Sequence, residues 1–188
     1  MKTILFCGTS NSGKTWMIER LVALWSRAGL RTAVLKHCSK GYQIDREGKD
    51  SARCWASGAA VVGVVGPEEF TVRRRDPSAD PLRIIAETFP RGLDVVLIEG
   101  FHAAPVPQVR VLAEADPFPP PDPRIIAFIH PAGGTHGGIP VFRPADAEEV
   151  SRFLVEKLGL VLARQVRAPS APETPSPGSI SPSDRTRP

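Results

Sequence analysis

Glycine, lysine and hydroxyl residues stand together near the start of the chain, in a pattern that fits phosphate binding. The stretch follows the apolar residues 4–7 and reads Gly8, Thr9, Ser10, Asn11, Ser12, Gly13, Lys14 and Thr15. Backbone N–H groups can close on phosphate oxygens only where no side chain intervenes, which glycine permits. Lys14 would then reach the β- and γ-phosphates, and Thr15 would offer its hydroxyl to Mg²⁺. The whole stretch is therefore predicted to be a nucleotide-binding P-loop, with a ligand-free glycine-rich turn as the alternative.

Two acidic residues are candidates for organising Mg²⁺ and its water. Glu99 follows the apolar residues 95–98, and P-loop proteins place such an acid at the end of a buried strand. Asp45 lies across a polar loop from His37, and could complete the Mg²⁺ shell or position an attacking water. We predict Glu99 and Asp45 as catalytic residues, and Thr15, Asp45 and Glu99 as metal ligands. A solvent-facing loop acid at Glu99 and a helix cap at Asp45 remain the alternatives.

Basic residues occur at two further places of interest. Lys36 and His37 end an expected strand at residues 31–36, beside the expected phosphate site. They are predicted to bind the γ-phosphate or a second substrate, although a lone histidine also serves as a loop hydrogen bonder. The arginine run at residues 73–75 matches the geometry of a phosphorylated partner. It equally fits a charged edge strand that prevents aggregation.

Apolar periodicity indicates strands that alternate with helices. The expected strands are residues 4–7, 31–36, 60–65, 69–74, 93–98, 108–112, 124–129 and 140–142, and the expected helices are residues 17–28, 45–58, 80–89 and 146–158. Asp146 and Glu149 fit a capping box for the last helix. Residues 60–74 suggest a hairpin at one sheet edge. The pattern predicts an α/β P-loop NTPase fold, with a mostly parallel sheet flanked by helices and an edge β-hairpin.

Composition limits the domain count and the location. The 188 residues, 41% hydrophobic and 23% charged, suit one nucleotide-binding domain, which we place at residues 1–162. Residues 163–188 are rich in proline and serine and predict a disordered tail or a linker to a missing second domain. Without a long apolar run or a signal peptide, we expect a cytoplasmic protein with no membrane partner.

Charge and cysteine content narrow the partners further. The net charge of +4 is modest and the aromatic residues are few, so we expect no nucleic-acid partner. Three cysteines without C-x-x-C spacing favour reduced thiols over disulfides or a structural zinc site.

With these residues placed, the sequence resembles the MobB family, the adaptor proteins of molybdopterin guanine dinucleotide biosynthesis, over about residues 2–160. The resemblance rests on G-T-S-N-S-G-K-T at residues 8–15, K-H at 36–37, I-D-x-x-G-K-D-S at 44–51, A-S-G-A at 56–59 and L-I-E-G-F at 97–101. The element at residues 44–51 discriminates most, because a P-loop alone marks many unrelated proteins. The chain departs from the family at His130 and Pro131, where an acidic residue is usual.

The resemblance implies a GTP-binding homodimer with weak GTPase activity. It implies work beside a MobA-like molybdopterin guanylyltransferase, with molybdopterin or its phosphate as a further partner. By position, it places Lys14 and Thr15 on phosphate and Mg²⁺, and Asp45 and Glu99 in the metal and water shell. Two other classes remain open from the residues: a P-loop small-molecule kinase or dethiobiotin-synthetase-like ATP-dependent ligase, and a nucleotide-dependent metal chaperone.

Overall fold

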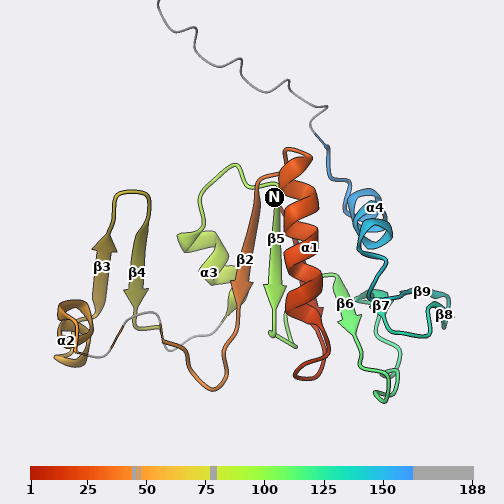
Figure 1. Cartoon of the computed structure of the whole chain (residues 1–188), viewed down its shortest axis with the longest axis horizontal. Helices are drawn as coiled ribbons and strands as arrows, with labels where there is room; N and C mark the ends of the chain where they lie inside the picture. The colour runs from red at the N-terminus through yellow and green to blue at the C-terminus, as the bar shows by residue number, and fades with distance from the viewer. Residues whose placement is uncertain (44–45, 47, 77–79, 163–188) are drawn as a thin grey trace, which may run out of the picture.

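A seven-stranded sheet forms the centre of the computed structural model, which describes residues 1–43, 46, 48–76 and 80–162 (Figure 1). The strand order is β2 (Thr32–Lys36), β5 (Val95–Glu99), β1 (Lys2–Cys7), β6 (Gln108–Val111), β7 (Ile125–Ile129), β9 (Ile139–Phe142) and β8 (Gly134–His136). Neighbouring strands are parallel except for β8 and β9. The predicted α/β fold with a mostly parallel sheet is confirmed.

Helices cover both faces of this sheet. On one face, α1 (Lys14–Arg27) and α4 (Ala147–Leu158) bury one apolar cluster against β1, β5, β6 and β7. The indole Nε1 of Trp25 in α1 donates a hydrogen bond to Ser151 Oγ in α4 at 2.9 Å. On the other face, α3 (Pro81–Thr88) packs Ile85 against the outward-facing side chains of β1 and β5. Strands β1 and β5 are thus buried on both faces, as parallel strands usually are.

Local residues explain where α1 ends and where α3 begins, but the signal predicted for the start of α4 is wrong. Gly29, which follows α1, adopts a φ of +81°. A residue with a side chain would reach this φ only with strain. Asp80 caps α3 by accepting a hydrogen bond from the N–H of Leu82 at 2.9 Å. The predicted capping box of α4 is wrong, because Asp146 instead accepts from the N–H of Arg143 at 3.1 Å.

Strand β2 is less buried than its sequence predicts. Val34 stands in the apolar run of residues 33–35, which is typical of a buried strand, but it is 42% exposed. The reason is its place in the sheet: β2 is the outermost of the described strands, with β5 as its neighbour on one side and no described strand on the other. Apolar β-branched residues occur in edge strands as well as in central strands, so the sequence alone could not show that β2 is an edge strand.

A second, smaller unit stands beside the main sheet (Figure 1). It consists of α2 (Asp50–Ala56) and the antiparallel strands β3 (Val61–Val65) and β4 (Phe70–Arg74). The predicted hairpin therefore forms, but as a two-stranded sheet of its own and not at an edge of the main sheet. The antiparallel strands β8 and β9 form the hairpin at an edge of the main sheet, at the end opposite β2.

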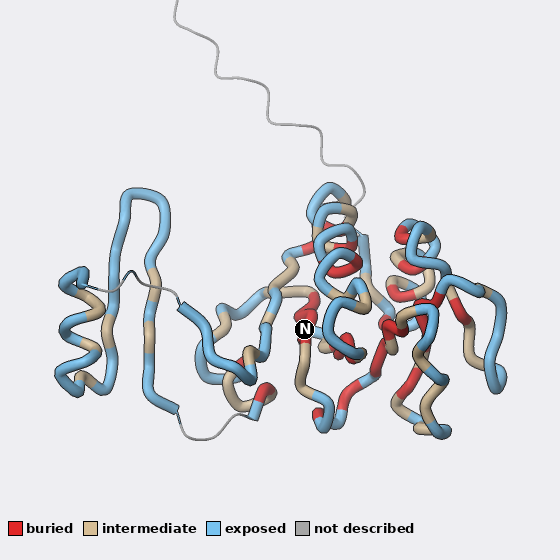
Figure 2. The backbone as a smooth tube through the Cα atoms, turned by 60° about the horizontal axis from the view of Figure 1, so that its bottom comes forward, coloured by how far each residue is buried: buried red, intermediate tan, exposed pale blue. Residues whose placement is uncertain are grey.

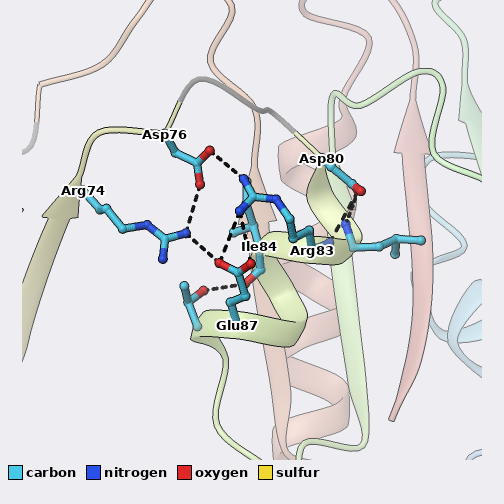
Figure 3. Close-up of polar contacts among 8 residues, drawn as sticks. Arg74, Asp76, Asp80, Arg83, Ile84 and Glu87 are labelled. Carbon is cyan, nitrogen blue, oxygen red and sulfur yellow. Dashed lines mark hydrogen bonds and ion pairs between the residues drawn. The ribbon is translucent and has the colours of Figure 1, made fainter.

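The arginine run at the end of β4 makes its contacts within the chain. Arg74 forms ion pairs with Asp76 at 2.9 Å and with Glu87 of α3 at 3.0 Å, and Arg83 pairs with the same two carboxylates (Figure 3). Hydrogen bonds from Arg74 and then from Arg83 lower the pKa of Glu87 below its ordinary value. This network connects the hairpin to α3.

The other two arginines of the run hold an aromatic ring. The guanidinium groups of Arg73 and Arg75 lie 4.0 Å and 4.1 Å from the ring of Trp55 in α2. Arg75 also donates hydrogen bonds to the carbonyl oxygens of Trp55 and Ala59. The run therefore joins β4 to α2 and α3. Neither of the two interpretations drawn from the sequence, a contact for a phosphorylated partner or a charged edge strand, included this role.

Apolar side chains on the hairpin face solvent. Val65 is 84% exposed and Phe70 74% exposed, and Val61, Val64 and Val72 are also largely exposed. Figure 2 shows the hairpin tube in the exposed colour along most of its length. Exposed apolar clusters of this kind mark interaction surfaces. Among the described helices, none combines the length and the apolar character that crossing a membrane requires.

Candidate functional site

The predicted P-loop joins β1 to α1 and lies tightly against the end of β6. A Cβ added to Gly8 would come within 2.0 Å of the Val111 carbonyl oxygen, so only glycine fits there. Gly13 is the N-cap residue of α1, with a φ of +96°. Asn11 also has a positive φ, of 63°. The loop thus directs the N-terminus of α1, with its positive dipole end, toward the space in front of it.

Lys14 lies folded over this loop. Its ammonium donates hydrogen bonds to the carbonyl oxygens of Gly8 at 3.1 Å and Thr9 at 2.5 Å, and to Ser12 Oγ at 3.4 Å. These oxygens are weak substitutes for phosphate oxygens, because they are neutral, whereas a phosphate oxygen carries a negative charge that attracts the ammonium more strongly. The lysine is therefore placed to bind an anion in the loop.

Three of the predicted site residues meet at the carboxyl ends of β2 and β5. Thr15 Oγ1 donates a hydrogen bond to Glu99 Oε1 at 2.9 Å, and Lys36 Nζ lies 3.2 Å from that same carboxylate oxygen. Lys36 Nζ also donates to Thr15 Oγ1 at 3.2 Å. Lys36 and Glu99 are directly paired in the β2–β5 register, which brings the two side chains together. Glu99 is only 6% exposed.

These oxygen donors fit Mg²⁺. A magnesium ion is usually held by one or two protein oxygens, with waters and substrate phosphates in the other positions. Thr15 Oγ1 and the Glu99 carboxylate provide such oxygens beside the loop. No cluster of three or more His, Cys, Asp or Glu side chains occurs within the described parts of the chain. Asp45, the other predicted metal and catalytic residue, lies outside the described residues.

A cavity of about 630 Å³ opens in front of the P-loop. Its described lining comes from the loop and the start of α1, from residues 36–41 after β2, and from Glu99, Gly100 and His102. The imidazole of His37 stacks on the ring of Phe101, with the ring centroids 4.6 Å apart. The backbone N–H of His37 donates a hydrogen bond to the Glu99 carbonyl oxygen at 2.8 Å. The structure therefore brings Lys36 and His37 to the same space as the P-loop.

Trp16 is the first residue after Thr15 and lines this cavity. It is 40% exposed, and the guanidinium of Arg20 lies 4.0 Å from its ring. Sequence reasoning missed this residue, because an aromatic residue at the start of an amphipathic helix usually signals only packing.

Sequence reasoning also missed Asp116, which contacts the P-loop from the loop after β6. Its Oδ2 accepts hydrogen bonds from Thr9 Oγ1 at 2.8 Å and from the N–H of Ala113 at 2.9 Å. The hydrogen bond from Ala113, and to a lesser degree that from Thr9, lowers the pKa of Asp116 below its ordinary value. The contact spans more than a hundred positions of sequence, and no local motif announces it.

His130 directly follows β7 and stabilises the turn after it. Its Nδ1 accepts a hydrogen bond from the N–H of Ala132 at 3.1 Å, and the residue is 9% exposed. The imidazole thus secures the turn that follows β7 and packs near Phe118, with ring centroids 5.3 Å apart.

Comparisons with known proteins agree with this geometry. The model of the MobB family, described as molybdopterin guanine dinucleotide synthesis protein B, matches residues 3–131. A Bacillus subtilis protein named as a probable molybdopterin-guanine dinucleotide biosynthesis adapter protein is 36% identical over 160 residues, which cover 81% of this chain and 91% of that protein. A Haemophilus influenzae adapter protein of the same biosynthesis is 33% identical over 123 residues, covering 64% of this chain and 69% of that one. The crystal structure of Bacillus subtilis MobB superimposes with a TM-score of 0.68 at 31% identity, over 84% of this chain and 98% of that one.

The close approach of the P-loop to β6 predicts unequal costs for two glycine substitutions. Gly13→Ala should lower the free energy of unfolding by about 1 kcal/mol, because a left-handed backbone strains alanine where space is free. Gly8→Ala should lower it by about 3 kcal/mol or more, because overpacking against β6 adds to the cost. Urea denaturation of both variants measures the difference. Equal losses would contradict the described packing.

Proposed function

The chain belongs to the MobB family and is an adapter protein of molybdopterin guanine dinucleotide biosynthesis, and we propose that it performs this task as a GTP-binding protein with weak GTPase activity. The observation that carries the proposal is the convergence of Lys14, Thr15 and Glu99 on one cavity. Guanine is preferred because the product named for the relatives contains it. The proposed setting is the cytoplasm.

Binding of the triphosphate would rearrange few groups. Lys14 exchanges the carbonyl oxygens of its own loop for β- and γ-phosphate oxygens, which are stronger acceptors for its charge. Thr15 and Glu99 would hold Mg²⁺, and His37 and Lys36, which line the same cavity, would border the terminal phosphate. When bound, Mg²⁺ neutralises charge that develops on the phosphate oxygens.

Slow hydrolysis follows from the same lining. No arginine lines the cavity among its described residues, so the positive charge that an arginine finger supplies would have to come from a partner. We propose a MobA-like guanylyltransferase as that partner, with molybdopterin or its phosphate as the molecule to which GMP is attached. Glu99 would orient the attacking water through the metal shell.

The exposed hairpin supports a homodimer. Val65 and Phe70 are far more exposed than apolar residues of a fully covered surface would be. Within the described part of the chain no further strand pairs with β3 or β4, so a second copy could pair with an edge of this two-stranded sheet. We propose that a second copy of the chain covers this hairpin.

Lys14→Ala should abolish tight nucleotide binding while the fold remains intact. The change removes charge-assisted hydrogen bonds of about 1.5–3 kcal/mol each, so affinity for GTP should fall at least about tenfold. Calorimetric titration with GTP and with ATP measures this, and thermal unfolding checks the fold. Stimulation of a guanylyltransferase by the adapter should be lost in parallel. Tighter binding of ATP than of GTP would favour the kinase or ligase alternative, and unchanged affinity in the variant would refute the P-loop assignment.

Glu99→Gln should slow GTP hydrolysis about tenfold or more and change GTP affinity much less. The phosphate cradle remains in this variant, but the organisation of metal and water is lost. Single-turnover hydrolysis and equilibrium titration of the same preparation separate the two effects. Equal turnover in variant and parent would reduce Glu99 to a structural acid.

Phe70→Ser should raise the dimer dissociation constant at least about tenfold, because exposed aromatic residues dominate protein interfaces. Val161→Ser is the matched control, since Val161 is 85% exposed but lies outside the hairpin. Sedimentation equilibrium gives both constants. A monomeric parent protein, or equal effects of the two changes, would exclude the hairpin as the dimer contact.

A further inference from the structure

The Lys36 ammonium lies between the two protein groups that fit Mg²⁺. It is 3.2 Å from Glu99 Oε1 and 3.2 Å from Thr15 Oγ1, which are themselves 2.9 Å apart. We propose that Lys36 takes the place of the metal in the nucleotide-free protein, and moves to the terminal phosphate when Mg²⁺ binds. This inference rests on the proposed nucleotide function and adds a competition between a residue of the chain and the metal.

The hydrogen-bond directions make the two cations competitors. Thr15 donates its hydroxyl proton to Glu99, so the lone pairs of its oxygen are the groups left for a metal. Lys36 donates to that oxygen and also lies against the carboxylate. A divalent ion on the same oxygens would lie a few ångströms from the ammonium, where like charges repel strongly in a partly buried site. Both cations cannot occupy the position together.

Lys36 is the group able to move. Its side chain is 50% exposed, whereas the Glu99 side chain is 8% exposed and lies at the end of the fully buried strand β5. The lysine stem starts from the edge strand β2, and the cavity extends from it toward the P-loop. Once the metal neutralises Glu99, the anion within reach of the ammonium is the terminal phosphate of a triphosphate. Metal binding thereby delivers a second lysine to that phosphate.

The competition is tested by the Mg²⁺ dependence of nucleotide binding. Lys36→Met retains the length of the side chain and removes its charge. Titration with GDP, which lacks the γ-phosphate that would receive Lys36, at a series of free Mg²⁺ concentrations should give a half-saturating Mg²⁺ concentration about threefold to tenfold lower than in the parent protein. Lys40→Met is the matched control, since Lys40 lines the same cavity but makes no hydrogen bond or ion pair with Thr15 or Glu99. That variant should leave the midpoint unchanged. A midpoint that is equal or higher in Lys36→Met overturns the competition.

The transfer to the terminal phosphate is tested by comparing GTP with GDP. At saturating Mg²⁺, Lys36→Met should weaken GTP binding about tenfold and GDP binding less than about twofold, because GDP lacks the γ-phosphate. Equal weakening for both nucleotides overturns the transfer. Thermal unfolding of both variants verifies that the fold is retained.

A measurement without nucleotide separates this inference from the proposed function. Mn²⁺ replaces Mg²⁺ and is detected by electron paramagnetic resonance, so its binding to the nucleotide-free protein can be followed directly. Lys36→Met should lower the half-saturating Mn²⁺ concentration about threefold or more relative to the parent and to Lys40→Met. Identical Mn²⁺ binding in all three proteins overturns the inference, even where GTP binding itself is established. Failure of GTP to bind, with the expected Mn²⁺ shift, would refute the proposed function alone.

Discussion

The Glu99 carboxylate is the constraint around which the site is arranged. A carboxylate that is 6% exposed costs free energy unless cations or hydrogen-bond donors compensate it. One donor, Lys36, comes from β2, and the other, Thr15, comes from the helix that β1 feeds. Both neighbours exist only because β5 lies between β2 and β1. The strand order therefore provides the partners that compensate the Glu99 charge, in addition to forming the apolar core.

The parts of this arrangement that sequence could predict are the local ones. The P-loop and the buried runs of β1 and β5 have short-range signals, namely glycine spacing and continuous apolar character. The meeting of Thr15 with Glu99 was also predictable, because parallel strands end at a common edge. The exposure of Val34 was not, since it depends on which strand is outermost. The contact of Asp116 with Thr9 likewise depends on chain segments that only the complete fold brings together.

The hairpin and the main sheet are joined in a different manner from the layers of the core. Around Trp25, helices are held by buried apolar contacts, whereas the hairpin is joined to α3 through the ion pair of Arg74 with Glu87 and that of Arg83 with Asp76, just after β4. Exposed ion pairs contribute little individually and weaken as salt is added. The orientation of the hairpin relative to the site is thus the part of the structure most sensitive to ionic conditions. Sequence patterns gave no sign of this, because an arginine run does not reveal its partners.

The three tryptophans make the chain its own optical probe. Trp16 borders the cavity, Trp25 is enclosed in the core, and Trp55 lies against two guanidinium groups of the hairpin. Indole emission depends on the polarity and charge around the ring, so each residue responds to a different event. A ligand at the P-loop changes the surroundings of Trp16, and a molecule that covers the hairpin changes those of Trp55. Trp25 serves as the constant internal reference, and single-tryptophan versions of the protein would separate occupancy from association without an attached dye.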